Sequence, residues 1–379
     1  MRILLVNHEY PPQGGGSGVA TKHLAEALVR VGHEVFVLTT ADEPRRDEEQ
    51  GVCVQRFRMT PPTGQLAGLR GWLSFLRRGP AALRKAVAEF NPDVINSQFL
   101  FPSGYVVART KTTVPHVAST VGAEIHDPSR RFSADRNWIM RACVRRVVGH
   151  ARVVTTSARD LTTRVRALYP HARDITEIPW PVPPVQPDSR SRHELQLRDD
   201  QFVITTLCRL VKRKRIDVLL RAIQMLSHAD VYLVVMGSGP LEGELRRMAS
   251  ELGLASVVRF TGQVSEADKA GYLGRSDVFC LPSDHEGFGL VFVEAMSLGT
   301  PVISTNVGGQ TDIIREGVDG FLVPLAGHAA LAKRIETLRT DRFMLSKMSQ
   351  TVPERAREFA PDVIARRFAE VYERARRTL

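Results

Sequence analysis

The sequence contains few cysteines and no long apolar run. Its 379 residues include only four cysteines, which are far apart in the chain and form no C-x-x-C pair: Cys53, Cys143, Cys208 and Cys280. This pattern is typical of reduced cysteines in a cytoplasmic protein, not of a disulfide framework or a cysteine metal site. No run of about 18 apolar residues is present, so no segment is expected to span a membrane. The apolar start at Ile3–Val6 is too short for a signal peptide.

The histidine patterns of metalloenzymes are also missing. The sequence has neither H-x-x-H nor H-E-x-x-H, so His8, His116, His126 and His285 are expected to be structural residues or ligand contacts. The sequence therefore predicts no metal site. A G-x-G-x-x-G dinucleotide fingerprint is absent too.

Positive charge is abundant and unevenly distributed. The formal net charge is +11, and residues 51–150 hold 15 Lys and Arg against 5 Asp and Glu, which gives 15 − 5 = +10. Such a surface suggests an anionic partner: membrane lipid, a phosphorylated acceptor or nucleic acid. An arginine-rich composition without a specific partner is the alternative.

Within this basic region, residues 69–87 interleave apolar and basic side chains. Trp72, Leu73 and Phe75 lie between Arg70 and Arg77, and such a combination fits a helix on an anionic membrane surface. A core-facing helix pair with solvated arginines is the competing interpretation. In either case Gly79-Pro80 is expected to divide the stretch into two pieces.

Alternating strand and helix patterns predict an α/β fold with two doubly wound parallel sheets. The proline-rich stretch 178–200 resists helix and separates residues 1–180 from 181–360. Residues 362–377 form a final amphipathic helix. The expected strands are 2–7, 34–39, 93–96, 116–120 and 153–156, then 203–207, 231–236, 258–260 and 278–281, and the expected helices include 18–31, 215–227, 241–252 and 267–274.

The most informative motif joins a strand to a helix at residues 286–294. Glu286 follows the strand that ends at Leu281, and Glu294 lies in an early turn of a helix that begins near Gly289. Ligands of open α/β sheets bind at such strand ends. Gly287 allows close approach of the backbone, and the amides of residues 287–290 suit an anionic or hydroxyl-rich ligand. The two glutamates would bind hydroxyls, because a carboxylate would repel a phosphate.

Basic residues and glycines occupy other strand ends. Arg209 and Lys214 follow the strand 203–207, where two cations can stabilise the charge of a leaving diphosphate. Lys212, Arg213 and Arg215 are expected to be surface residues. The loop 11–18, with four glycines, and the turn 237–240 can cradle phosphate or acceptor, although ordinary turns would look the same.

Taken together, these motifs resemble those of glycosyltransferase family 4, the retaining GT-B enzymes that use a nucleotide-activated sugar. The resemblance extends over nearly the whole chain. It comprises Pro11-Pro-x-x-Gly-Gly, Pro92-Asp-Val-Ile95, Arg209-x4-Lys214, Gly237-x-Gly-Pro240, Phe260-x-Gly262, Glu286-x7-Glu294 and Gly299-x-Pro-Val-Ile303.

The resemblance implies roles for individual residues. Glu286 would contact donor-sugar hydroxyls and act with Arg209 and Lys214 at the reaction centre, while Glu294 would hold the ribose. The remaining expected contacts are Gly16, Gly237, Val264, Gly287, Phe288, Gly289 and Leu290 for the donor, and Gly15, Glu124 and His126 for the acceptor. The chain departs from the family at Val121, where a histidine is common, and at Cys208 and Arg215, where glycine is common.

The family also implies an architecture and a reaction. The two Rossmann-like domains would face a central cleft, and a last helix, 361–379, would cross back to the first domain. The expected enzyme moves a hexosyl group from a UDP-, GDP- or ADP-sugar to an acceptor hydroxyl on a glycan, a lipid-linked molecule or a small molecule, without metal or cofactor. It would be cytoplasmic, with a possible peripheral site on the inner membrane face. A glycoside hydrolase or phosphorylase with paired carboxylates and a nucleic-acid-binding protein are the alternatives.

Overall fold

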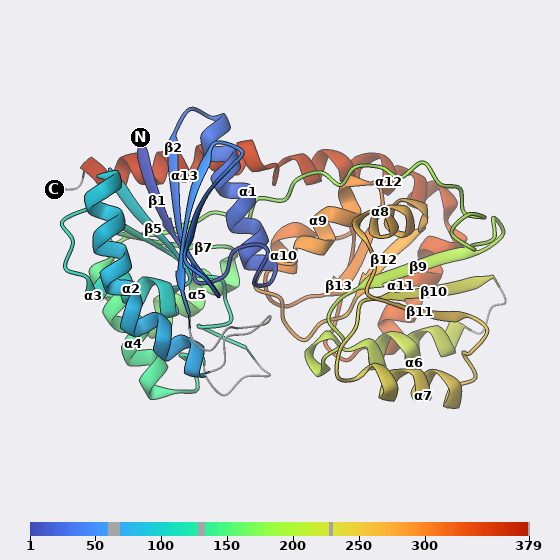
Figure 1. Cartoon of the computed structure of the whole chain (residues 1–379). Coiled ribbons are helices and arrows are strands. Elements are labelled where there is room, and N and C mark those ends of the chain that lie inside the picture. The colour runs from blue at the N-terminus through green and yellow to red at the C-terminus, as the bar shows by residue number, and fades with distance from the viewer. Residues whose placement is uncertain (60–68, 128–132, 227–229, 378–379) are drawn as a thin grey trace. The chain divides into compact units, whose positions relative to one another are not determined.

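The structure is a computed structural model that describes residues 1–59, 69–127, 133–226 and 230–377. The chain forms two compact units, one comprising Met1–Pro183 with Phe359–Leu379 and the other Pro184–Glu358. Each unit is built on its own mainly parallel sheet (Figure 1). The two units are described separately below.

The first unit contains an eight-stranded sheet of order β3-β4-β2-β1-β5-β6-β7-β8. All neighbouring pairs are parallel except β3 and β4. The strands are β1 (Arg2–Val6), β2 (Glu34–Ala41), β3 (Arg45–Glu49), β4 (Val52–Arg58), β5 (Val94–Gln98), β6 (His116–Ser119), β7 (Val153–Thr156) and β8 (Ile175–Glu177). The helices are α1 (Gly16–Arg30), α2 (Leu69–Phe90), the π-helical turn η1 (Leu100–Gly104), α3 (Tyr105–Arg109), α4 (Trp138–His150), α5 (Arg159–Leu168) and α13 (Pro361–Arg377).

Alternating residues of β1 supply the two faces of this sheet. Ile3 and Leu5 belong to one core cluster together with side chains of α1 and α13. Leu4 and Val6 belong to another, with residues of α2 and α3. This alternation follows from the two-residue period of a strand, and it places helices on both faces of the sheet as the sequence predicts.

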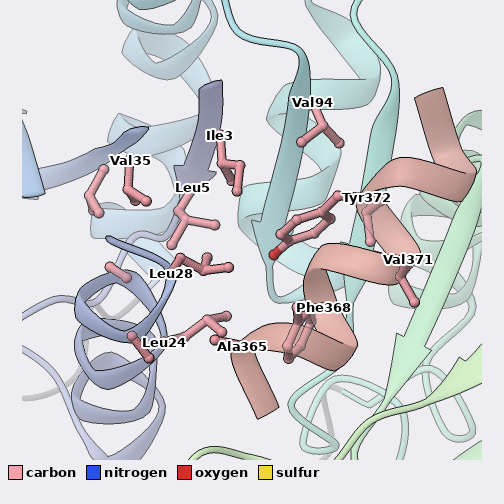
Figure 2. Close-up of a cluster of buried hydrophobic side chains, with 14 of the residues drawn as sticks. Ile3, Leu5, Leu24, Leu28, Val35, Val94, Ala365, Phe368, Val371 and Tyr372 are labelled. Atoms are coloured by element: carbon pink, nitrogen blue, oxygen red, sulfur yellow. The ribbon is translucent and has the colours of Figure 1, made fainter. Parts of the chain in front are cut away.

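The C-terminal helix α13 is an integral part of the first unit. Its Phe368, Val371 and Tyr372 belong to the same core cluster as Leu5 and Val94 of the sheet, and Figure 2 shows Tyr372 beside Val94. The Tyr372 hydroxyl also donates a hydrogen bond to the Asn96 side-chain oxygen at 2.9 Å. The last helix of the chain therefore returns to the first sheet, as the family resemblance implies.

Helix α2 shows that the expected break at Gly79-Pro80 is wrong, and it decides between the two interpretations of residues 69–87. It runs from Leu69 to Phe90 without interruption and contains Pro80, so Gly79-Pro80 does not divide the stretch. Its apolar residues Phe75 and Leu83 are buried in the core. The core-facing interpretation is therefore right for most of this apolar face, and the helix exposes mainly its basic side.

The second unit has a six-stranded parallel sheet of order β11-β10-β9-β12-β13-β14. The strands are β9 (Phe202–Leu207), β10 (Val231–Met236), β11 (Val258–Gly262), β12 (Val278–Leu281), β13 (Val302–Thr305) and β14 (Gly320–Val323). The helices are the 3-10 turn η2 (Lys212–Lys214), α6 (Ile216–Leu226), α7 (Glu242–Glu251), α8 (Glu266–Arg275), α9 (Leu290–Ser297), α10 (Gln310–Ile313), α11 (His328–Thr340) and α12 (Arg342–Arg357). From β9 the chain continues to β10 and β11 on one side of the sheet, and from β12 it continues to β13 and β14 on the other side. The β9–β12 boundary is therefore the topological switch point.

Within the described ranges, no helix is both long and apolar enough to cross a membrane.

Acid should destabilise the first unit through His8, which is buried between the rings of Phe99 and Phe75. Burial lowers the pKa of His8 from 6.5 to about 4, although the nearby Glu9 charge opposes part of this effect. Folding therefore favours the neutral ring, and the stability this provides is full above pH 6.5 and is lost as the pH falls towards 4. We expect a loss of roughly 3 kcal/mol in unfolding free energy over that window from His8 alone.

The measurement is chemical denaturation at several pH values. His8→Asn should have a shallower dependence of stability on pH than the parent protein between pH 4 and 6.5. The exposed His193 supplies the control, since His193→Asn should leave the slope unchanged. An unaltered slope in His8→Asn would contradict the assignment.

Candidate functional site

The second unit gathers the predicted site residues at one edge of its sheet. Arg209 and Lys214 follow β9, and Glu286 follows β12, the strand that pairs directly with β9. Gly237 and Val264 follow the next two strands, β10 and β11. Because all these strands are parallel, their carboxyl ends share one edge, and the two central ones flank the switch point where α/β sheets bind ligands.

Glu286 and Lys214 form the central contact of this edge. The Lys214 ammonium donates a hydrogen bond to the Glu286 carboxylate at 2.6 Å. Glu286 is only 7% exposed, and both charged groups are largely removed from water. A buried ion pair of this kind holds each partner in place, because leaving either charge unpaired is costly.

Arg213 supplies a second positive charge beside Glu286. Its guanidinium lies 3.5 Å from the other carboxylate oxygen and donates to the His285 backbone carbonyl at 3.2 Å. The expectation that Arg213 is only a surface residue is therefore wrong. Sequence spacing could not reveal this contact, because it depends on how the β9 and β12 loops meet.

These two cations keep Glu286 ionised. Burial by itself would raise the pKa of the Glu286 carboxyl, but the charges of Lys214 and Arg213 outweigh burial and lower its pKa to about 2. Glu286 is therefore a carboxylate throughout the neutral range. It can accept hydrogen bonds, but it cannot donate a proton.

The backbone around Glu286 is fixed by a second loop with two glycines. The Gly309 amide donates to the Glu286 carbonyl at 2.7 Å. A Cβ atom at Gly309 would lie 2.6 Å from the Gly287 carbonyl oxygen, and one at Gly308 would lie 2.7 Å from the Glu286 carbonyl oxygen. Only glycine permits this approach, so the Gly308-Gly309 pair positions the Glu286 loop.

Arg215 holds the lysine loop in an unusual conformation. Its φ of +51° places it in the left-handed region, which normally favours glycine, and the family resemblance expects glycine here. The guanidinium bonds to Asp217 at 3.1 Å and to Asp284 at 3.0 Å. Arg215 thus links the β9 loop to the β12 loop, and it is not an unpaired surface residue.

Glu294 has a basic partner that the sequence analysis did not identify. It lies in α9, and its carboxylate accepts a hydrogen bond from the Lys269 ammonium of α8 at 3.0 Å. Lys269 also contacts Glu266 at 2.6 Å. Burial works against the Lys269 charge, but Glu294 and Glu266 outweigh it and raise its pKa. Glu294 remains partly accessible.

The remaining predicted donor contacts follow the same loops. Glycine is required at Gly237, where φ is +106° and a Cβ would lie 2.1 Å from the Cys208 carbonyl oxygen. Gly289 is the N-cap of α9, and Leu290 is the first residue of that helix, directly after Gly287 and the buried Phe288. Arg209 is exposed, and no ion pair joins it to another described residue.

In the first unit, the glycine loop leads into α1. Gly15 is the N-cap of this helix and Gly16 its first residue. The Glu9 carboxylate accepts hydrogen bonds from the Gly15 amide at 3.3 Å and from the Ser17 hydroxyl at 2.9 Å. The chain's own carboxylate therefore caps the helix N-terminus, an arrangement that the motif alone did not indicate.

Arg56 stabilises the glycine loop, and sequence analysis did not identify this role. Its side chain is 1% exposed and donates to the Pro11 carbonyl at 2.9 Å and to Glu49 at 2.7 Å. Asp47 is a further ion-pair partner. Arg56 belongs to β4, and Asp47 and Glu49 belong to β3. The β3–β4 hairpin, which the sequence analysis did not predict, therefore brings both carboxylates to the Arg56 guanidinium.

The two other predicted acceptor residues follow β6. Glu124 is buried, and its carboxylate accepts hydrogen bonds from the Val121 amide at 3.0 Å and the Leu100 amide at 3.2 Å. Burial raises the pKa of Glu124 although these hydrogen bonds oppose it. His126 lies 2.6 Å from Asp135. Both residues belong to one short loop after β6.

Within the described part of the chain, no group of three or more His, Cys, Asp or Glu side chains is arranged to hold a metal ion.

Two family profiles match the chain, one for each unit. The profile described as "Glycosyl transferases group 1" matches residues 188–359, and "Glycosyl transferase 4-like domain" matches residues 15–181. Together they cover the strand-end loops described above.

Individual proteins match along most of their length. The lipopolysaccharide core biosynthesis glycosyltransferase LpsD of Rhizobium meliloti is 32% identical over 298 residues, covering 77% of this chain and 78% of that protein. The GDP-mannose-dependent alpha-(1-6)-phosphatidylinositol monomannoside mannosyltransferase of Mycolicibacterium smegmatis is 26% identical over 362 residues, covering 89% of each. Sucrose-phosphate synthase of Thermosynechococcus elongatus has a similar fold, with a TM-score of 0.84, 23% identity and 98% coverage of both chains.

Breaking the Lys214–Glu286 pair from one side should be strongly destabilising. We expect Lys214→Met or Glu286→Gln to cost about 3 kcal/mol of unfolding free energy, because each leaves a buried charge without its partner. The double variant should cost less than the sum of the two, as measured by denaturation in a double-mutant cycle. The contribution is full above pH 4.5, the ordinary pKa, and fades as the pH falls towards about 2.

The exposed pair Arg247–Glu251, with a separation of 3.5 Å in the same unit, is the matched control. Its removal should cost less than about 1 kcal/mol. Strict additivity of the two site substitutions would show that the buried contact is not energetically coupled.

Proposed function

The chain belongs to glycosyltransferase family 4 and has the GT-B fold, and from that premise we propose that it transfers a hexosyl group from a nucleotide diphosphate sugar to an acceptor hydroxyl with retention of configuration. The observation that carries this proposal is the buried Lys214–Glu286 contact at the switch point of the second sheet. It unites, in one place, a cation suited to phosphate and a carboxylate suited to sugar hydroxyls.

In the proposed reaction, Lys214 and Arg209 act on the leaving group. As the bond between the sugar and the diphosphate breaks, negative charge grows on the diphosphate oxygens, and fixed cations stabilise that charge. Arg209 is exposed and has no ion pair among the described residues, so its guanidinium is available for a bidentate phosphate contact. The departing diphosphate would take the proton of the attacking hydroxyl.

The charge of Glu286 argues against the hydrolase alternative. A glycosidase needs a carboxylic acid that is protonated near neutral pH to assist the leaving group. Lys214 and Arg213 instead lower the pKa of Glu286 to about 2, which leaves no proton to donate. One Glu286 oxygen is also occupied by Lys214, so this carboxylate suits hydroxyl binding better than nucleophilic attack.

Glu294 would bind the ribose of the donor. Its carboxylate is partly accessible and can accept hydrogen bonds from two adjacent hydroxyls, while Lys269 fixes its orientation. The mannosyltransferase relative of M. smegmatis is named as GDP-mannose-dependent, which supports a nucleotide sugar as donor. UDP-, GDP- and ADP-sugars all fit the proposal.

The first unit would bind the acceptor, through the loop at Gly15 and the loop that carries Glu124 and His126. Relatives named for lipopolysaccharide core and phosphatidylinositol mannoside synthesis support a glycan or lipid-linked acceptor. A peripheral site on an anionic membrane surface fits such an acceptor and the +10 charge of residues 51–150. We propose that the reaction needs no metal, since basic side chains can neutralise the diphosphate.

Donor binding tests the ribose assignment. Bound ligand raises the melting temperature by mass action, so thermal-shift screening with UDP-, GDP- and ADP-sugars in EDTA should give a shift with one base. Calorimetry with that nucleotide should then show at least tenfold weaker binding to Glu294→Ala, because about 1.4 kcal/mol is lost with charge-assisted hydrogen bonds. Glu251→Ala, on the exposed surface of α7, should bind normally. Normal affinity in Glu294→Ala would remove the assignment.

Catalysis tests the role of the exposed arginine. Arg209→Met should lower kcat by a factor that corresponds to about 2–4 kcal/mol, by analogy with the loss of one oxyanion donor. The melting temperature should hardly change, because Arg209 makes no ion pair with any described residue. Nuclear magnetic resonance of the first-formed product should show the anomeric configuration of the donor. An inverted product would rule out the retaining mechanism.

A further inference from the structure

Two large apolar side chains are exposed at the start of α4. Trp138 is 79% exposed and Ile139 is 54% exposed, and they are the first two residues of the helix. The helix start is well defined, because the Asn137 side chain caps it by accepting a hydrogen bond from the Met140 amide. Singly exposed apolar residues are common, but here two large apolar side chains are adjacent and a capped helix start fixes their position.

The same face of α4 is basic. Arg141 and Arg145 are exposed three and seven residues after Trp138, and this spacing places them on one side of a helix. The thirteen residues of α4 include three arginines and no acidic residue. The apolar pair therefore lies at the end of a positively charged helix face.

Helix α2 presents a similar outer face. Leu73 is 57% exposed, and Arg70 and Arg77 lie on the same side of the helix. Helix α2 carries five basic residues against one acidic residue, Glu89, which is paired with Lys85 and Arg46. No ion pair joins Arg70, Arg77 or Arg145 to another residue within the described ranges. Their charges are therefore available to a partner.

The two helices lie on one face of the first sheet, and α3 contacts both of them. Trp72 of α2 packs against the core cluster that contains Met140 and Val144 of α4, and its ring lies 5.5 Å from that of Phe101. Figure 1 shows the three helices on the same side of the sheet. Both outer faces thus belong to one unit and can meet one partner.

We propose that this α2–α4 surface, made of Arg70, Leu73, Arg77, Trp138, Ile139, Arg141 and Arg145, docks on an anionic lipid bilayer. Trp138 and Ile139 enter the boundary between headgroups and acyl chains, where tryptophan is preferred. The arginines bind lipid phosphates. This inference rests on the proposed membrane-associated function but concerns a surface outside the donor site.

The positive charge of the α2–α4 surface favours an anionic bilayer as its partner. Each basic residue near an anionic membrane strengthens binding roughly fivefold, and this attraction falls with salt. Stable peripheral binding needs two signals, an apolar insertion and a basic patch, and the surface supplies both. The apolar side of the basic amphipathic stretch 69–87 does not insert into the membrane as a whole, because Phe75 and Leu83 are buried in the core.

The test is flotation of the full chain with phosphatidylcholine vesicles that contain or lack phosphatidylglycerol. Binding should require phosphatidylglycerol and fall as salt rises. We expect Trp138→Ser/Ile139→Ser and Arg141→Gln/Arg145→Gln each to weaken binding about tenfold or more. Phe343→Ser, at an 81% exposed phenylalanine of α12 in the second unit, is the control and should bind as the parent protein does.

Tryptophan fluorescence gives a second readout. Of the three tryptophans, Trp180 is buried, Trp72 is half-buried and only Trp138 is highly exposed. Anionic vesicles should therefore shift the emission to the blue through Trp138, and Trp138→Phe should abolish that shift while retaining most binding. Binding without a blue shift, equal binding by the Trp138→Ser/Ile139→Ser variant, or no preference for phosphatidylglycerol would each overturn the proposal.

Nucleotide binding separates this proposal from that of the donor site. The Trp138→Ser/Ile139→Ser variant should keep the parent protein's affinity for the nucleotide found by thermal shift. If the parent protein binds nucleotide but floats with neither vesicle type, the docking surface is wrong and the transferase proposal stands. If it floats but binds no nucleotide sugar, the donor assignment fails instead.

Discussion

The buried contact between Lys214 and Glu286 is the constraint on which the arrangement at the switch point of the second sheet depends. Two opposite charges are held at 2.6 Å in a place almost closed to water, and such a pair is stable only when its surroundings fix both partners. Arg213 adds a second cation, Arg215 links the two loops, and the Gly308-Gly309 backbone presses against the Glu286 loop. Each of these features serves to keep one carboxylate ionised and oriented.

The first unit uses the same kind of sheet edge in a different way. Its central strands carry buried neutral polar groups, including Asn96, Ser119 and Thr155, which bond to one another and to Tyr372 of α13. His8, at the end of β1, is kept neutral by burial. The two sheets therefore differ: a buried cluster of charged side chains follows the strands of the second unit, whereas neutral polar side chains bond to one another on the strands of the first.

The two faces of the first sheet also differ in their outer layers. One is covered by α1 and by α13, the last helix of the chain, whose Phe368 and Tyr372 complete the core (Figure 2). The other is covered by α2, α3 and α4, and α2 and α4 turn arginines and apolar side chains outward. Part of the excess positive charge of residues 51–150 thus lies on the outer faces of two helices, α2 and α4, and not on a single amphipathic segment.

Strong local patterns allowed the sequence to predict the α/β class, most strands, the strand-end positions of Arg209, Lys214 and Glu286, and the helical position of Glu294. Buried parallel strands are near-continuous apolar runs, and glycines punctuate their turns. The β3–β4 hairpin was missed because β3, Arg45–Glu49, contains only charged residues. The interruption at Gly79-Pro80 was wrongly expected, because a packed helix can tolerate a proline that local preference disfavours.

The sequence by itself determined which residues stand at the ends of strands, since that order is encoded by local apolar periodicity and turn chemistry. Only the tertiary structure decided which of them touch. The contacts of Arg213 with Glu286, of Lys269 with Glu294 and of Arg56 with Pro11 join segments 25 or more residues apart. Such contacts depend on strand order and on the close approach of separate loops, and the spacing of residues within a single motif determines neither.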